Sequence, residues 1–146
     1  MIAIASDHGG YELKLELMAH LRARGLEYRD FGCFSGDSCD YPDFGEPAAR
    51  AVAAGECDRG ILICGTGVGM SITANKIRGI RCALCGDCYT AELTRKHNDA
   101  NILAMGARVV GPGLAEKIMD TFLDTSFEGG RHARRVAKIH QVEACG

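Results

Sequence analysis

Residues 60–64, Gly-Ile-Leu-Ile-Cys, constrain the fold of this chain more than any other segment. A strand with one face in water alternates polar and apolar residues, whereas this run has no polar position. Such a strand is covered on both faces, as strands are in parallel sheets with helices on either side. We therefore predict that residues 60–64 form the central strand of a sheet of this kind.

The rest of the chain alternates short apolar runs with segments of helical periodicity. Strands are predicted at residues 2–6, 26–31, 60–64, 80–85 and 102–105, with an irregular loop over residues 32–42. Helices are predicted at residues 13–24, 48–54, 70–76, 87–96 and 112–123, and a last, basic helix starts near Arg131 with Val136 and Ile139 on its apolar side. This order predicts an α/β fold with one domain over residues 1–146. It would be a three-layer α-β-α sandwich with a five-stranded parallel, Rossmann-like sheet and a C-terminal helix.

Composition argues against several classes of partner. The formal net charge is -2, with 17 basic and 19 acidic side chains, so no general attraction for nucleic acid or for an anionic membrane is expected. The first residues lack the basic segment of a signal peptide, and no apolar run approaches the length of a membrane span. We therefore expect a cytoplasmic protein without nucleic-acid or membrane partners, whose eight cysteines are reduced thiols.

Ligands of open parallel sheets bind beyond the carboxyl ends of the strands, where three polar loops are predicted. They are Asp7-His8 after the first strand, residues 65–69 after the third and Gly86-Asp87 after the fourth. Residues 65–69 carry glycine at alternate positions, which lets backbone amides approach an oxyanion, and the next helix adds its positive end. Cys64 heads this loop, where the same field would favour a thiolate able to act as a carbon-acid base beside amides that stabilise an enediolate.

Each of these features also has a purely structural interpretation. The glycines could serve only the packing of strand against helix, with Cys64 as a buried apolar residue. Asp7 could cap a helix beside a solvated His8, although the same pair could handle hydroxyl protons. A dinucleotide fingerprint with Asp87 as its acidic partner fits poorly, because Met70 stands where a small residue is required.

The local sequence does not decide the role of three further features. His97 ends a predicted helix, where the helix dipole favours a histidine without any function. Arg131 and Arg135 lie one helical turn apart, a spacing that suits a phosphate but is also ordinary surface charge. The thiols of residues 82, 85 and 88 look like part of a cluster motif. A fourth thiol is missing and residues 82 and 85 would point to opposite faces of a strand, so packing is favoured over a metal.

Taken together, six segments of the chain resemble the type B ribose-5-phosphate isomerases, a family related to the subunits of galactose-6-phosphate isomerase. The resemblance covers nearly the whole chain and is carried by residues 6–10, 40–42, 60–69, 95–101, 106–111 and 128–132. It implies the interconversion of ribose 5-phosphate and ribulose 5-phosphate through an enediolate, without a metal or an organic cofactor.

The resemblance also implies a role for each candidate residue. Cys64 would move the proton between carbons 1 and 2, and His97, assisted by Asp7 and Thr66, would open the furanose ring. The enediolate oxygen would be held by the amides of Gly65, Thr66, Gly67, Val68 and Gly69. Asn98 would bind sugar hydroxyls, Tyr41 would lie near the sugar, and the phosphate would lie among His8, Arg108, Arg131 and Arg135.

Members of the family are dimers or pairs of dimers, so the resemblance further implies active sites shared between subunits. His97, Asn98 and Arg108 would be contributed to the Cys64 loop of the partner subunit. A six-carbon substrate such as allose 6-phosphate or galactose 6-phosphate is the alternative within this class. A binding module without chemistry is the alternative outside it, since architecture does not dictate activity.

Overall fold

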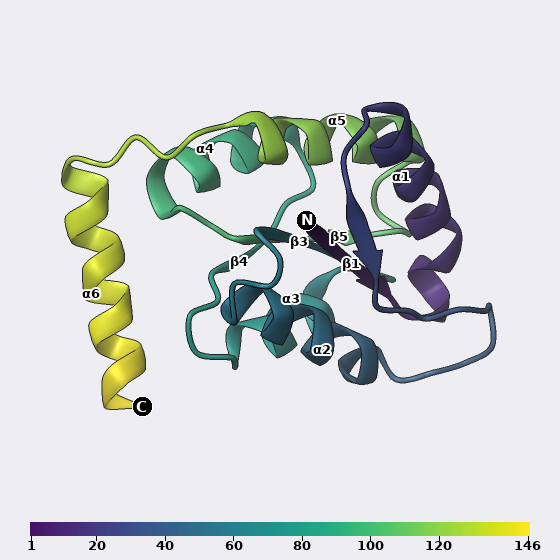
Figure 1. The fold of residues 1–146 in the computed structure, drawn as a ribbon, viewed down its shortest axis with the longest axis horizontal. Coiled ribbons are helices and arrows are strands. Elements are labelled where there is room, and N and C mark those ends of the chain that lie inside the picture. The colour runs from purple at the N-terminus through teal and green to yellow at the C-terminus, as the bar shows by residue number, and fades with distance from the viewer.

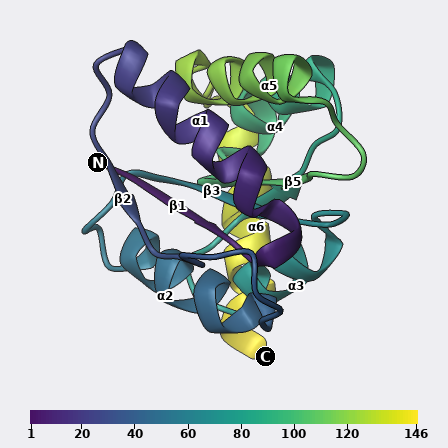
Figure 2. The same cartoon turned by 90° about the vertical axis from the view of Figure 1, so that its right-hand side faces the viewer.

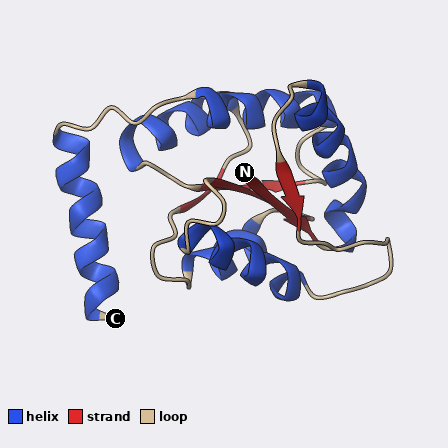
Figure 3. Ribbon diagram, viewed as in Figure 1, coloured by secondary structure: helices blue, strands red, loops and turns tan.

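The computed structural model describes all 146 residues and contains one five-stranded parallel sheet (Figure 3). The strand order is β2-β1-β3-β5-β4, with β3 in the centre as predicted. Their bounds are β1 (Ile2–Ser6), β2 (Tyr28–Asp30), β3 (Arg59–Cys64), β4 (Cys82–Leu84) and β5 (Ile102–Gly106). The register pairs Ser6 with Ile63 and Cys64 with Gly106, so β1, β3 and β5 end side by side at one edge.

Helices cover both faces of the sheet, which confirms the predicted three-layer α/β class (Figures 1 and 2). One face carries α1 (Tyr11–Ala23), α4 (Cys88–Asn98) and α5 (Pro112–Asp124), and the other carries α2 (Tyr41–Ala53) and α3 (Val68–Asn75). Alternate residues of each strand enter the two cores: Ile61 and Ile63 face the α1 side, while Leu62 and Cys64 face the α2 side. Burial of both strand faces is the physical reason that residues 60–64 show no polar alternation.

The start of α2 differs from the prediction. We expected a loop through Pro42 and a helix from Ala48, but the helix begins at Tyr41, directly after the extended residue Asp40. Pro42 lies in the first turn, where its missing N–H leaves no hydrogen bond unmade, and Gly45 and Pro47 within the helix conceal it in the sequence. The early start turns Tyr41 toward the carboxyl edge of the sheet. Smaller differences are shorter edge strands and a 3-10 turn, η1 (His8–Gly10), that was not predicted.

Helix α6 (Arg131–Cys145) stands apart from the three layers at one side of the molecule (Figure 1). Only His132 and Val136 of this helix are buried, at 8% exposure each. Ile139, which we expected on a covered apolar side, is 47% exposed and lines an open groove with Ile80, Cys82 and Val142. Within one chain α6 is therefore buried only in its first two turns, while further along it Nε2 of His140 bonds to the Arg81 guanidinium at 2.8 Å and the Glu143 carboxylate accepts from the amide of Gly79. None of the helices has both the length and the apolar composition needed to cross a lipid bilayer.

The loop between β2 and α2 is tied down by a fully buried lysine. Lys14, on α1, has no exposed surface; its ammonium donates to the Asp30 carboxylate at 2.7 Å and to the carbonyl oxygen of Cys33. The same ammonium lies over the rings of Tyr11 and Phe34, at 5.5 and 5.2 Å from their centroids. One charge thus fixes the end of β2 and the first residues of the loop that leads to Tyr41.

Candidate active site

A pocket of about 430 Å³ opens at the carboxyl ends of β1 and β3. Between these two strands the direction of the connections reverses: β1 leads to β2 on one side, and β3 leads to β4 on the other side. Such switch points are where open α/β sheets bind ligands. The pocket is lined by Asp7, Tyr41, Cys64, Gly65, Thr66, Val68, Gly69, Ile72 and Arg108. Eight of these nine residues were predicted from the sequence or from the family resemblance.

The loop after β3 can take its shape only with glycine at its tight points. Gly67 has a φ of 82°, and a Cβ there would lie 2.8 Å from the carbonyl carbon of Met105. A Cβ on Gly69 would meet the Tyr41 ring at 2.5 Å, so the ring packs directly on this glycine. Gly67 itself faces Met105 and does not line the pocket. The glycines therefore serve close packing, as the structural interpretation proposed, and also shape the loop.

The backbone of this loop offers donors to a ligand. The amides of Gly65, Thr66 and Gly67 make no hydrogen bond within the protein, and the amide of Val68 donates to the Thr66 hydroxyl at 3.3 Å. Helix α3 begins at Val68, so its positive end lies behind the same loop. Gly65 and Thr66 line the pocket, so their free amides at a helix start are placed where they can donate to an anion.

Cys64 lies at the base of this loop and is 4% exposed. Its carbonyl oxygen accepts from the amide of Ala107 at 2.9 Å, and that of Gly65 accepts from the amide of Arg108 at 3.0 Å. These two bonds join the loop after β5 to the loop after β3. Arg108 consequently lies against Gly65 in the pocket, and its guanidinium has no carboxylate partner, which leaves it free for an anion.

Asp7 caps a helical turn and also lines the pocket. Its carboxylate accepts from the amide of Gly10 at 3.1 Å and so caps η1, yet it also lines the pocket. His8 is exposed beside the pocket, and its Nδ1 accepts from the amide of Cys39 at 3.2 Å. Asp7 is therefore positioned to meet a bound ligand, while His8 lies at the rim.

Gly86-Asp87, the third loop predicted at the site, is not part of it. Asp87 caps α4 by accepting from the amide of Thr90 at 2.7 Å. β4 is an edge strand, separated from β3 by β5, so its loop lies away from the switch point. The loop after β5 takes its place and supplies Arg108.

The remaining predicted residues form a second group, which we call the α4–α6 cluster: His97, Asn98, Arg131 and Arg135, together with Glu128 and His132. Helix α4 ends at Asn98 and leads into β5, whose first residue Ile102 pairs with Gly60 near the start of β3. Cys64 lies four residues further along β3, or about 13 Å. Within a single chain, His97 therefore lies near the amino ends of the strands and Cys64 at the carboxyl end of β3.

Three side chains of the α4–α6 cluster have the chemistry of metal ligands. The ligand-type atoms of His97, Glu128 and His132 lie within 4.8 Å of one another. The two imidazole rings are stacked, with centroids 4.2 Å apart and planes 11° apart. Because a metal lies in the plane of each imidazole that binds it, parallel rings cannot both direct a nitrogen lone pair at one ion. The geometry of the two imidazoles is that of a stacked pair and does not suit a shared metal ion.

Comparison with known proteins agrees with this architecture. Residues 2–139 match the family described as Ribose/Galactose Isomerase. The chain belongs to this family. Ribose-5-phosphate isomerase B of Escherichia coli (strain K12) is 53% identical over 142 residues, which cover 97% of this chain and 95% of that protein. The solved structure of Clostridium thermocellum ribose-5-phosphate isomerase B has a TM-score of 0.97 and 59% identity, covering 98% of this chain and 97% of that one.

A third relative carries a different name. D-erythrulose-4-phosphate isomerase of Pectobacterium atrosepticum is 45% identical over 143 residues, covering 97% of this chain and 94% of that protein. The family resemblance and the fold class predicted from the sequence are thus confirmed. One detail differs: the resemblance grouped Arg108 with residues of a partner subunit, whereas Arg108 lines the pocket of its own chain.

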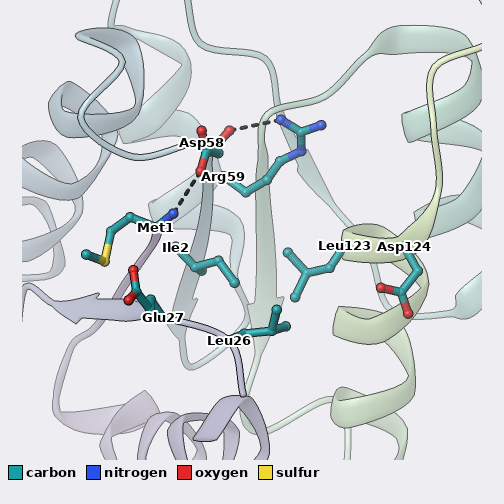
Figure 4. A pocket seen from close by; sticks show the side chains of 8 residues that line it. All are labelled: Met1, Ile2, Leu26, Glu27, Asp58, Arg59, Leu123 and Asp124. Carbon is teal, nitrogen blue, oxygen red and sulfur yellow. Dashed lines mark hydrogen bonds and ion pairs between the residues drawn. The ribbon is translucent and has the colours of Figure 1, made fainter. Parts of the chain in front are cut away.

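Other features of this isomerase-family chain lie away from the pocket. A second pocket of about 490 Å³ opens near the amino ends of β1 and β3 (Figure 4). There the Met1 ammonium pairs with Asp58 at 2.8 Å, and Arg59 donates to the carbonyl oxygen of Asp58. Among the thiols, burial raises the pKa of Cys82 and of Cys85, which pack on opposite faces of the sheet as predicted.

Sequence reasoning missed Ile72, Glu128 and His132. Ile72 follows Val68 by one helical turn on α3, so helical spacing from the predicted loop could have placed it at the pocket. Glu128 and His132 stand inside the segment that carried the resemblance, but only the packing of α6 on α4 shows that they contact His97.

Proposed function

We propose that this chain is an aldose-ketose isomerase that interconverts ribose 5-phosphate and ribulose 5-phosphate through an enediolate. The observation that carries the proposal is Cys64 beside the free amides of Gly65 and Thr66, with the unpaired Arg108 in the same pocket. An aldose-ketose shift requires a base between carbons 1 and 2 and donors for the oxyanion that develops beside it. Membership of the Ribose/Galactose Isomerase family supports the same reaction class.

The pocket residues suggest how the reaction proceeds. The thiolate of Cys64 removes the proton from carbon 2 of the open-chain aldose and returns it to carbon 1. The free amides of Gly65 and Thr66 stabilise the negative oxygen of the enediolate, and the helix dipole of α3 adds to this stabilisation. Asp7, Thr66 and Tyr41 contact the sugar. No metal or organic cofactor is required by this scheme.

Ring opening and phosphate binding need groups that the pocket of one chain lacks. We propose that the enzyme is a homodimer or a pair of dimers, in which the α4–α6 cluster of one subunit faces the Cys64 pocket of the other. His97 would then open the furanose ring, Asn98 would bind hydroxyls, and Arg131 and Arg135 would join His8 and Arg108 around the phosphate. The separation of His97 from Cys64 within one chain supports this arrangement.

Mixing two inactive variants tests the shared site. Cys64→Ala and His97→Ala subunits, unfolded together and refolded as a 1:1 mixture, should regain about a quarter of the wild-type activity. Half of the dimers are then mixed, and each mixed dimer carries one site with both groups intact. Either variant refolded alone is the control. A mixture no more active than its components would contradict sites shared between subunits.

Hydrogen exchange in D₂O tests the chemistry independently of product formation. With ribulose 5-phosphate, which is an open-chain ketose, the enzyme should introduce deuterium at carbon 1, detected by NMR or mass spectrometry. Turnover of a panel of ribose, allose, galactose and erythrulose phosphates identifies the sugar. A six-carbon sugar phosphate with the highest kcat/KM would replace ribose 5-phosphate as the substrate. Binding without exchange or turnover would refute the enzymatic assignment.

We place the enzyme in the cytoplasm, with a small sugar phosphate as its ligand and with no nucleic-acid or membrane partner. The absence of a general positive charge supports the lack of nucleic-acid and membrane partners.

A further inference from the structure

His97, on the last turn of α4, has an otherwise free side chain whose position is set by two neighbours. Its side chain is 39% exposed, so part of the ring lies open to solvent. The ring of His132, from the first turn of α6, stacks on it with centroids 4.2 Å apart. Glu128, in the connection from α5 to α6, places Oε1 3.6 Å from Nε2 of His97. One face and one edge of the imidazole are thus occupied by protein.

Both neighbours are themselves held in place. The amide of Glu128 donates to the carbonyl oxygen of Lys96 at 3.1 Å, which ties this connection to the last turn of α4. The amide of His132 donates to Gly129 at 3.1 Å, within a turn where Gly129 and Gly130 both have positive φ. His132 is 8% exposed. The backbone bonds and the burial together make a rigid support for a side chain that is itself exposed.

The two imidazoles differ in how far a ligand can reach them. Burial lowers the pKa of His132, and the nearby His97, Arg131 and Arg135 lower it further. His132 therefore stays neutral near pH 7, which avoids a positive charge beneath the ring of His97. The carboxylate of Glu128 faces Nε2 of His97. His97 is the more exposed of the two rings and is the one that a ligand can reach.

We propose that His132 and Glu128 are positioning residues for His97, with His132 fixing the plane of the ring and Glu128 fixing its Nε2 edge. The proposal rests on the function proposed above, in which His97 opens the furanose ring. It adds two residues that touch His97 and are not assigned to the sugar, and it gives a reason for docking α6 through its first turn. Proton transfer demands such support, because an error of about 1 Å in the position of a catalytic group can cost about 100-fold in rate.

Substitutions at position 132 separate stacking from other effects. His132→Ala should lower kcat with ribose 5-phosphate at least 10-fold, while exchange at carbon 1 of ribulose 5-phosphate in D₂O stays within twofold of wild type. Exchange needs Cys64 but no ring opening, so a general loss of structure would lower both. His132→Phe keeps a flat ring in the stack and should restore most of kcat. The matched control is Val136→Ala, which weakens the packing of the same helix but leaves the stack intact.

Glu128→Ala and Glu128→Gln test the contact at Nε2. Glu128→Ala removes the side chain that faces this nitrogen and should lower kcat with ribose 5-phosphate several-fold, while exchange at carbon 1 of ribulose 5-phosphate stays within twofold of wild type. Glu128→Gln keeps an oxygen with the same reach and should restore most of kcat. A merely structural role for Glu128 would lower kcat and exchange together.

Several outcomes would overturn the proposal. If Val136→Ala lowers kcat as much as His132→Ala, docking of α6 and not the stack is responsible. If His132→Ala or Glu128→Ala has wild-type kcat, the corresponding positioning role is wrong. His97→Ala separates these failures from failure of the proposed function. If that variant turns over ribose 5-phosphate at the wild-type rate, His97 does not open the ring and the function assigned to it fails first.

Discussion

Replacement of Cys64 by alanine should reduce kcat for ribose 5-phosphate by at least about 100- to 10,000-fold, the range observed when a positioned acid-base group is lost. Exchange of deuterium into carbon 1 of ribulose 5-phosphate should fall by a similar factor, because both reactions need the same thiolate. Binding of the substrate should change little, since the phosphate and hydroxyl contacts remain. Stopped assays for kcat, NMR for exchange and calorimetry for binding provide the three measurements.

A buried thiol near the opposite end of β3 serves as the control. Cys57 lies just before β3, is 2% exposed, and has its pKa raised by burial. Cys57→Ala should keep full activity, with at most a modest loss of stability from the small cavity. Full activity in Cys64→Ala would refute Cys64 as the base. Equal loss in both variants would show that thiol removal disturbs the core and not the chemistry.

Replacement of Lys14 by methionine should lower the free energy of unfolding by about 3–5 kcal/mol, the cost of breaking a buried ion pair by removing one partner. Lys14 is fully buried, and Asp30 would keep its charge without the ammonium that now faces it. The carbonyl oxygen of Cys33 would lose its donor as well. Such a loss is a large part of the roughly 5–15 kcal/mol that stabilises a typical domain. Denaturant titration followed by circular dichroism measures it.

An exposed lysine serves as the control that separates the loss of a charge from the loss of a buried ion pair. Lys117 on α5 is exposed and has no carboxylate partner, so Lys117→Met should change the free energy of unfolding by less than about 0.5 kcal/mol. The double variant Lys14→Met with Asp30→Asn removes both charges and should be more stable than Lys14→Met alone. A single variant as stable as wild type would show that the pair contributes nothing to folding.

The sequence was most informative where a local pattern has a single physical cause. The apolar run of β3 required burial of both strand faces, and the glycines of residues 65–69 required close backbone approach; both expectations are met. It was least informative at α2, where Gly45 and Pro47 resemble helix breakers although packing of Gly45 against Met70 keeps them in a helix. It also misplaced the Gly86-Asp87 loop, because strand order cannot be read from strand sequence.

From the sequence alone came the fold class, the family resemblance and the anion-binding loop with Cys64 at its head. These depend on hydrophobic periodicity and on glycine, whose effects act over a few residues and are visible in the chain itself. Only the tertiary structure decided which candidates share a pocket. The strand order brings Asp7, Cys64 and Arg108 together, and the docking of α6 on α4 stacks His132 on His97 at the other edge of the sheet. Those contacts join segments that are distant in sequence, so no local pattern could predict them.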